Sequence, residues 1–458
     1  MTSKSKSLIA RLSHPQADTA SEQEAEPRVS TSPETPRTSP EPALEAADKS
    51  PVKHDLRTTT QEDLTVFIVA GEHSGDLLGA DLMQELSFRR KGQVRFLGVG
   101  GEAMETHGLT SLFPLADIAV MGPIPIIKAL PRLTSRVYRT VAAGVVAKPD
   151  VIIIIDSPEF THQVARRLSR KLPDTPIVDY VCPSVWAWRP GRAKKMARFI
   201  DHVLALLPFE PAALERLGGP DATYVGHPLS ERLDWIHAID KEMWAARFGL
   251  DRERIPLVVL PGSRRSEVEK LMPVFGDTVS ALDKAGYNCE LLMPCVPHLR
   301  RRIEELSKDW PMRRHYLDGD EAKFAAFRIA RAALAASGTV TLELGVSGTP
   351  MVVAYRVDGI AAKLRFLVKV DSVVLANLVI EEKAFPEFIQ EDCTAEQLST
   401  TLIALLQDGP ERQAQVEALG RLREKMQIVD ETPSQRAADV VMQYTSHAQA
   451  RKRMYPQP

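Results

Sequence analysis

The chain has 458 residues, which is too long for one ordinary core and suits two domains with additional segments. Hydrophobic residues make up 44% of the chain and its formal net charge is −2, so it has the composition of a globular protein and not that of a dedicated nucleic-acid-binding protein. Its apolar runs are far shorter than the ~18 residues of a membrane-spanning helix. No secretion signal is recognised near Met1, so we expect a cytoplasmic protein.

The N-terminal segment, residues 1–62, contains no Phe, Trp or Tyr and is rich in Ser, Thr, Pro, Glu and Ala. Such a segment cannot bury enough apolar surface to offset the entropy lost on ordering. We therefore predict a disordered tail. A variable tail and a start codon assigned too early both explain it without a function.

Short apolar runs alternate with longer amphipathic stretches from residue 64 onward. The first run, 64–70, ends in a glycine turn and is typical of a buried parallel strand. Helical patterns such as 163–172 lie between the runs, and this alternation predicts doubly wound parallel sheets. The further strands are expected at 95–99, 151–155, 177–182, 203–207, 222–225, 256–260, 290–293, 332–336 and 350–354.

The strands fall into two series, which predict an α/β fold of two Rossmann-like domains. The first domain is expected at 63–228 and the second at 229–430. A C-terminal helix and tail are expected at 431–458.

Two loops of the first domain carry polar side chains where ligands of parallel sheets bind, beyond the carboxyl ends of strands. The loop 71–76 holds Glu72, Ser74 and Asp76 but lacks a GxGxxG fingerprint, so it does not indicate a dinucleotide. Asp156 ends the run 151–155, where a partly buried carboxylate can deprotonate an attacking hydroxyl. Helix capping explains both loops as well.

Two loops of the second domain have the residue types of an anion site. Gly262 and Ser263 stand at an expected helix start beside Arg264, so backbone N–H groups and a guanidinium can share phosphate charge. Ser337, Gly338 and Thr339 begin another expected helix. Glu343 lies one turn further, where its carboxylate can accept both hydroxyls of a ribose. Arginines on a solvated turn and a capped helix with a surface glutamate are the alternatives.

Carboxylates in the loops of the first domain and anion-binding residue types in the loops of the second indicate different roles. We expect the second domain to hold a nucleotide diphosphate and the first to supply an acceptor site and a base. The chain has no P-loop, HExxH or GxSxG motif, which disfavours P-loop NTPases, zinc proteases and serine hydrolases.

A set of motifs, in this order, resembles the lipid-A-disaccharide synthase family between about residues 64 and 430. The run SVWAW at 184–188 is the most distinctive. Small departures occur: His73 replaces the usual Ala, and Ala376 replaces a common Pro. The motifs lie at 69–76, 119–122, 155–158, 183–188, 207–210, 225–228, 260–264 and 337–343.

The resemblance implies a GT-B fold, with two Rossmann-like domains facing across a cleft, and an inverting transfer. UDP-2,3-diacylglucosamine would donate its sugar to the 6-hydroxyl of 2,3-diacylglucosamine 1-phosphate (lipid X), giving a β-1,6 link and UDP. It implies no metal or other cofactor. A UDP-N-acetylglucosamine 2-epimerase, a transferase for a soluble acceptor and a non-catalytic UDP-sugar-binding regulator are the alternatives.

The resemblance also assigns roles to residues by position. Asp156 corresponds to the proposed base and Arg264 to the arginine near the donor phosphates, and Glu72 is grouped with them as catalytic. Asn377 corresponds to an asparagine near the active site. The expected UDP-binding residues are Ser263, Arg264, Ser337, Gly338, Thr339, Glu343 and Asn377.

Acyl chains need an apolar surface, and the segment 121–127 is apolar and followed by Lys128, Arg132, Arg136 and Arg139. This combination predicts contact with acyl chains and an anionic bilayer, at the cytoplasmic face of the inner membrane. A core-facing helix with a basic solvent side is the alternative. No nucleic-acid partner is expected, and a homodimer is an open alternative. A second basic stretch, facing phosphate, lipid head groups or only solvent, comprises Arg189, Arg192, Lys194, Lys195 and Arg198.

Overall fold

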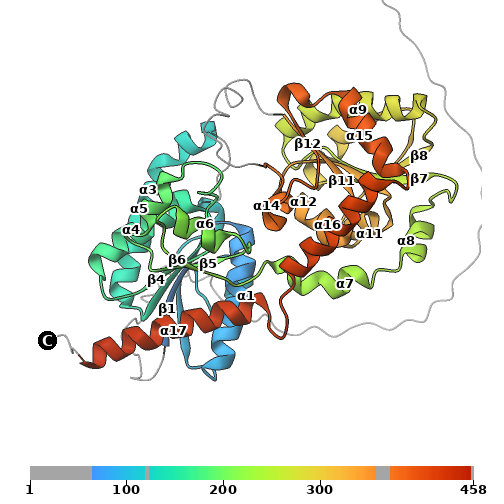
Figure 1. Cartoon of the computed structure of the whole chain (residues 1–458). Coiled ribbons are helices and arrows are strands. Elements are labelled where there is room, and N and C mark those ends of the chain that lie inside the picture. Colours follow the sequence, from blue (N-terminus) through green and yellow to red (C-terminus); the bar gives the residue numbers. More distant parts are fainter. Residues whose placement is uncertain (1–63, 119–122, 357–371, 455–458) are drawn as a thin grey trace, which may run out of the picture. The chain divides into compact units, whose positions relative to one another are not determined.

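The computed structural model describes the backbone of residues 64–118, 123–356 and 372–454 (Figure 1). The tail predicted for 1–62 lies outside these residues. Two six-stranded sheets, in which all the paired strands are parallel, organise the described chain.

The first sheet has the order β2-β1-β3-β4-β5-β6. Its strands are β1 (Leu64–Ala70), β2 (Val94–Val99), β3 (Val151–Ile155), β4 (Ile177–Tyr180), β5 (His202–Ala205) and β6 (Asp221–Tyr224). The helices that follow these strands are α1 (His73–Arg89), α2 (Glu102–Thr106), α3 (Pro123–Ala147), α4 (Pro158–Lys171), α5 (Gly191–Met196) and α6 (Glu210–Arg216).

Both faces of the first sheet are buried at its centre, where β1 and β3 are buried at every position. In β3, Ile153 and Ile155 enter one core while Ile152 and Ile154 enter the other, as the two-residue period of a strand requires. Helices α1 and α2 contribute to the first core, and α3, α4 and α5 contribute to the second.

The first core also receives a helix from the far end of the chain. Ala437, Ala438, Val440 and Val441 of α17 (Pro433–Met454) are buried with residues of α1, β1 and β3. Arg89 of α1 forms an ion pair with Asp439 of α17. A C-terminal helix was predicted at 431–458, but its place on the first sheet was not.

The second sheet has the order β12-β11-β10-β7-β8-β9. Its strands are β7 (Ile255–Leu260), β8 (Cys289–Pro294), β9 (Arg313–Leu317), β10 (Ala332–Ala336), β11 (Met351–Tyr355) and β12 (Glu387–Ile389). The helices of this part are α7 (Leu233–His237), α8 (Lys241–Phe248), α9 (Arg265–Lys284), α10 (Arg300–Ser307), α11 (Asp320–Ile329), α12 (Val340–Ser347), α14 (Leu375–Ile380), α15 (Ala395–Leu406) and α16 (Pro410–Met426).

The ten strands expected from the sequence are present, with ends that shift by a few residues. The sequence did not predict β9 and β12, which form the two edges of the second sheet. The sequence of β9 is RRHYL and β12 has three residues, so neither gives the apolar run of a central strand.

Candidate functional site

Each sheet has a switch point, where successive strands leave a central strand toward opposite edges. In the first sheet it lies between β1 and β3, and in the second between β7 and β10. Loops that leave the carboxyl ends of such strands diverge and leave room for a ligand. The four loops singled out in the sequence follow these four strands.

The loops after β1 and β3 hold the carboxylate of Asp156 in place. Ser74 Oγ donates a hydrogen bond to Asp156 Oδ2 at 3.1 Å, and the Ser157 N–H donates one to Asp156 Oδ1 at 2.7 Å. Ser157 Oγ in turn donates to Glu72 Oε1 at 2.8 Å. Glu72 is therefore linked to Asp156 through Ser157, whose hydroxyl bonds Glu72 and whose backbone N–H bonds Asp156.

The backbone at Asp156 is strained. Asp156 and Ser157 have φ values of 56° and 43°, in the left-handed region that residues other than glycine rarely adopt. The turn approaches Gly71 so closely that a Cβ on Gly71 would lie 2.2 Å from Ser157 Cβ. The glycine after β1 therefore makes this geometry sterically feasible.

Asp76 has a structural role. It is buried, and its carboxylate accepts hydrogen bonds from the N–H groups of Gly101, Ala103 and Met104 at 2.6–3.2 Å. These N–H groups belong to the first turn of α2 and the residue before it, so Asp76 caps that helix. The capping alternative concerned the helix that follows this loop, α1, but Asp76 stands inside α1 and caps α2 instead.

The loop after β7 is closed by Glu267 of α9. Glu267 Oε2 accepts from the Ser263 and Arg264 N–H groups at 3.1 and 3.2 Å, and Arg264 Nη1 donates to Oε1 at 2.8 Å. Gly262 has a φ of 113°, and a Cβ there would lie 2.6 Å from Glu267 Oε2. Glu267 thus fixes the turn while the Arg264 side chain stays 63% exposed.

The loop after β10 presents the start of α12. Ser337 Oγ donates to the Val373 carbonyl at 2.6 Å, so this hydroxyl is engaged by the protein. Gly338 has a φ of 149°, and Thr339 is exposed at the N-cap without a side-chain capping bond. Glu343 forms an ion pair with Lys323 of α11 at 3.1 Å.

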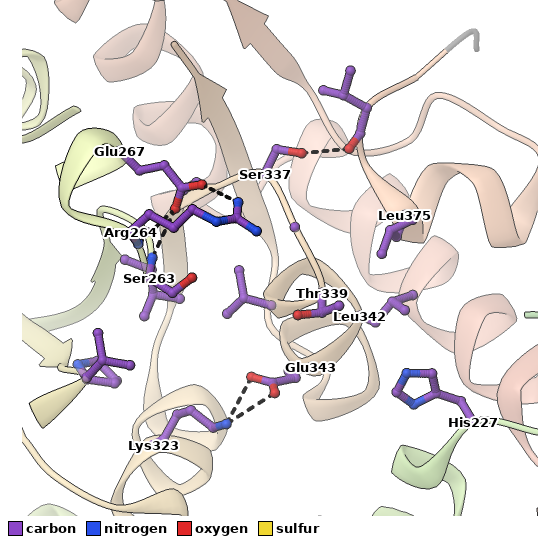
Figure 2. A pocket seen from close by; sticks show the side chains of 18 of the residues that line it. His227, Ser263, Arg264, Glu267, Lys323, Ser337, Thr339, Leu342, Glu343 and Leu375 are labelled. Carbon is purple, nitrogen blue, oxygen red and sulfur yellow. Dashed lines mark hydrogen bonds and ion pairs between the residues drawn. The ribbon is translucent and has the colours of Figure 1, made fainter. Parts of the chain in front are cut away.

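These second-domain residues line one cavity of about 870 Å³ (Figure 2). Figure 2 shows Arg264 held by Glu267 and Glu343 held by Lys323 at the cavity. All the predicted UDP-binding residues line it except Asn377. The sequence thus identified the two polar loops of this wall, after β7 and β10.

Asn377 lies in the interior, at 2% exposure. Its side-chain amide donates to the Phe385 carbonyl at 2.9 Å and to Ser372 Oγ at 3.2 Å, while its carbonyl oxygen accepts from the Phe385 N–H at 2.9 Å. The side chain joins α14 to the segment before β12. Its predicted place among the UDP-binding residues is not supported by a cavity contact here.

Asp156 lines a second cavity, of about 350 Å³. The two cavities share Val181, Cys182 and Ser184 as lining residues. The structure therefore places Asp156 and Arg264 on neighbouring cavities and not within one.

Glu210, His227 and Lys323 are among the lining residues of the larger cavity that were not singled out individually in the sequence. Glu210 accepts from Trp186 Nε1 at 3.2 Å and from the Leu206 and Leu207 N–H groups at 3.1 and 3.0 Å. Glu210 and His227 stand within motifs of the resemblance, which was the available signal. Lys323 had none.

Burial shifts the protonation of two of these groups. It raises the pKa of Glu210 to about 7, against the lowering effect of its three hydrogen bonds. It lowers the pKa of His227 to about 4, so this imidazole is neutral at pH 7. Its Nδ1 accepts from the Leu229 N–H at 3.1 Å.

The segment 121–139, predicted to contact the membrane, begins outside the described residues. Residues 119–122 and the side chains of 123–128 lie outside the described residues. Arg132 and Arg139 are exposed on α3, while Arg136 pairs with Asp117 at 2.6 Å. Among the helices of the described ranges, none has the length and hydropathy needed to cross a bilayer.

No cluster of three or more His, Cys, Asp or Glu side chains suited to a metal ion occurs in the part of the chain that the structure describes. Its four cysteines are buried and unbridged.

Solved structures with the same fold include glycosyltransferases and epimerases. The UDP-GlcNAc 2-epimerase of Neisseria meningitidis, bound to UDP-GlcNAc, matches with a TM-score of 0.53 at 12% identity, over 84% of this chain and 100% of its own. MurG of Acinetobacter baumannii matches with a TM-score of 0.52 at 14% identity, over 83% and 99%. At such identities the likeness establishes the two-domain GT-B fold alone.

Sequence relatives are far closer. A family described as Lipid-A-disaccharide synthetase matches residues 66–441. The lipid-A-disaccharide synthase of Nitrobacter hamburgensis is 46% identical over 392 residues, which are 85% of this chain and 98% of the relative. That of Rhodopseudomonas palustris strain HaA2 is 49% identical over 385 residues, or 84% and 97%. The epimerase and soluble-acceptor alternatives are not favoured, and the chain belongs to the lipid-A-disaccharide synthase family, hexosyltransferases of lipid A biosynthesis.

Proposed function

We propose that the chain transfers 2,3-diacylglucosamine from UDP to the 6-hydroxyl of 2,3-diacylglucosamine 1-phosphate, with inversion at the anomeric carbon. The supporting observation is the pairing of loops at the two switch points. One pair orients the Asp156 carboxylate, and the other presents Arg264 and two helix starts to a cavity.

In the proposed step, Asp156 accepts the proton of the acceptor's 6-hydroxyl while the oxygen of that hydroxyl attacks the anomeric carbon of the donor sugar. The bond between that carbon and the β-phosphate oxygen breaks, and UDP leaves with the electron pair. The hydrogen bonds from Ser74 and Ser157 support this role because they fix the carboxylate before the acceptor binds. Glu72 positions Ser157.

The charge that grows on the departing UDP needs stabilisation, which we assign to the second domain. Arg264 and the backbone N–H groups at the starts of α9 and α12 can donate to the diphosphate, and the helix dipoles act in the same direction. Glu343 is proposed to accept the ribose hydroxyls. No metal ion is assigned a part in this scheme.

The decisive assay mixes purified protein with UDP-2,3-diacylglucosamine and lipid X, measures UDP release and identifies the disaccharide by mass. We expect Asp156→Asn and Arg264→Gln to lower kcat by roughly 10²–10³-fold. Two exposed residues outside both cavities provide matched controls, Asp174→Asn and Arg216→Gln, which should retain activity. Normal turnover by Asp156→Asn would reject the base assignment.

We further propose that the enzyme works at the cytoplasmic face of the inner membrane and contacts it through the segment 121–139. The support is the sequence of apolar and then basic residues there. In flotation with anionic liposomes, replacing Ile124, Ile126 and Ile127 together by Ser should reduce binding. Unchanged binding removes the proposal.

A further inference from the structure

The smaller cavity combines the proposed base with two arginines. Asp156 and Glu159 line it, and so do Trp188 and Arg189, which precede α5, and Arg192 in the first turn of α5. Carboxylates and guanidinium groups in one cavity of about 350 Å³ suit a ligand that carries both a hydroxyl and an anion.

Arg189 occupies a conformation that needs a reason. Its φ is 56°, in the left-handed region where a residue with a side chain is strained. Its guanidinium lies over the Trp188 ring, 4.3 Å from the ring centroid. Trp188 is 43% exposed, so this strained turn presents an aromatic face and a cation together at the cavity.

Arg192 is the more sheltered of the two cations, with 21% of its side chain exposed. Nη1 donates to Glu159 Oε1 at 2.9 Å, and the Glu159 side chain is 77% exposed. An ion pair with so exposed a carboxylate contributes little stability and exchanges easily. A phosphate monoester, with its charge near −2 and three acceptor oxygens, is a stronger partner for the same guanidinium.

The other cations of this basic stretch differ. Lys194, Lys195 and Arg198 are exposed and line neither cavity. The chain therefore places Arg189 and Arg192, and not the whole stretch, beside Asp156.

We propose that the smaller cavity is the acceptor site and that Arg189 and Arg192 bind the 1-phosphate of the acceptor sugar. This inference rests on the proposed function. The acceptor carries its phosphate on C1 and its reacting 6-hydroxyl on the CH2OH group of C5, and these two carbons flank the same ring oxygen, so both groups can reach one small cavity. With the phosphate on the arginines, the hydroxyl faces Asp156, and the sugar packs against Trp188.

The test compares two acceptors, 2,3-diacylglucosamine 1-phosphate and the same sugar with a free 1-hydroxyl, by kcat/KM for UDP release. Wild type should prefer the phosphorylated acceptor by roughly 10- to 100-fold, the range of hydrogen bonds to charged groups. Arg189→Gln with Arg192→Gln should bring this preference close to 1. Lys194→Gln with Lys195→Gln, on the same segment, should keep the wild-type preference.

Activity of the double arginine variant on the acceptor without phosphate provides the folding control. A wild type without preference, or an arginine variant that keeps it, overturns the assignment. The assignment is also overturned if the double arginine variant loses binding to anionic vesicles but keeps the wild-type acceptor preference. In that case the arginines would bind lipid head groups. Absence of UDP release by wild type with either acceptor instead refutes the proposed function.

Discussion

The buried carboxyl of Glu210 should make the stability of the protein depend on pH in an unusual direction. Burial raises its pKa from an ordinary 4.5 to about 7 in the folded protein. The folded state then binds more protons than the unfolded state between these values, so ionisation of Glu210 destabilises the fold as pH rises from 4.5 to about 7. Most carboxyl groups in proteins act in the opposite sense.

The size of the effect follows from the shift. A rise from 4.5 to about 7 corresponds to roughly 3 kcal/mol of unfolding free energy, complete above pH 7. Glu210→Gln removes the titration. The stability of this variant relative to wild type should therefore increase by about that amount between pH 4.5 and pH 8.

Urea denaturation at several pH values, followed by circular dichroism, measures this difference. The glutamine also changes the bonds to Trp186, Leu206 and Leu207, but that contribution is constant with pH. Glu215→Gln, on the exposed side of the same helix, is the matched control, because it makes the same chemical change outside the core. A flat difference for Glu210→Gln would refute the reasoning.

Three further predictions concern named contacts. Gly71→Ala places a Cβ 2.2 Å from Ser157 Cβ, which displaces the turn that holds Asp156 and should lower kcat at least ~10-fold. Gly191→Ala, with open space at its Cβ, is the control and should not lower kcat. Equal kcat values for the two variants would contradict this. Asn377→Ala removes three buried hydrogen bonds and should reduce the unfolding free energy, measured in urea, by roughly 2–4 kcal/mol. The affinity for UDP, measured by calorimetry, should stay nearly unchanged. Unchanged stability with a large loss of UDP affinity would show that Asn377 belongs to the UDP site. His227→Gln removes an imidazole whose pKa is lowered by burial from 6.5 to about 4. The unfolding free energy of wild type should therefore fall by roughly 3 kcal/mol relative to the variant as pH falls from 6.5 through 4. A difference between the two proteins that stays constant with pH in urea denaturation would disprove this.

The central strands and the loops that follow them were predictable because they obey local rules. β3 is a run of five apolar residues, and the glycine and serine turns after β7 and β10 carry the residue types of helix starts. The edge strand β9 was not predictable, since it has one buried residue among five and shows no continuous apolar run.

Side-chain roles that depend on distant partners were also beyond the sequence. Asp76 and Asp156 follow similar strands, yet one caps α2 and the other lines a cavity. Asn377 was expected among the UDP-binding residues, but Phe385, eight positions away, engages its amide. The role of such a side chain depends on which loop lies next to it in the folded protein, and the spacing of residues along the chain does not show this directly.

The return of α17 to the first sheet has a consequence for biosynthesis. Its residues 437–441 complete a core whose other members lie between 64 and 225, so about two hundred residues must emerge from the ribosome in between. Until they do, the apolar surface of α1, including Leu82 and Leu86, lacks part of its cover. We expect the first domain to finish folding only after the second has been made and α17 has emerged.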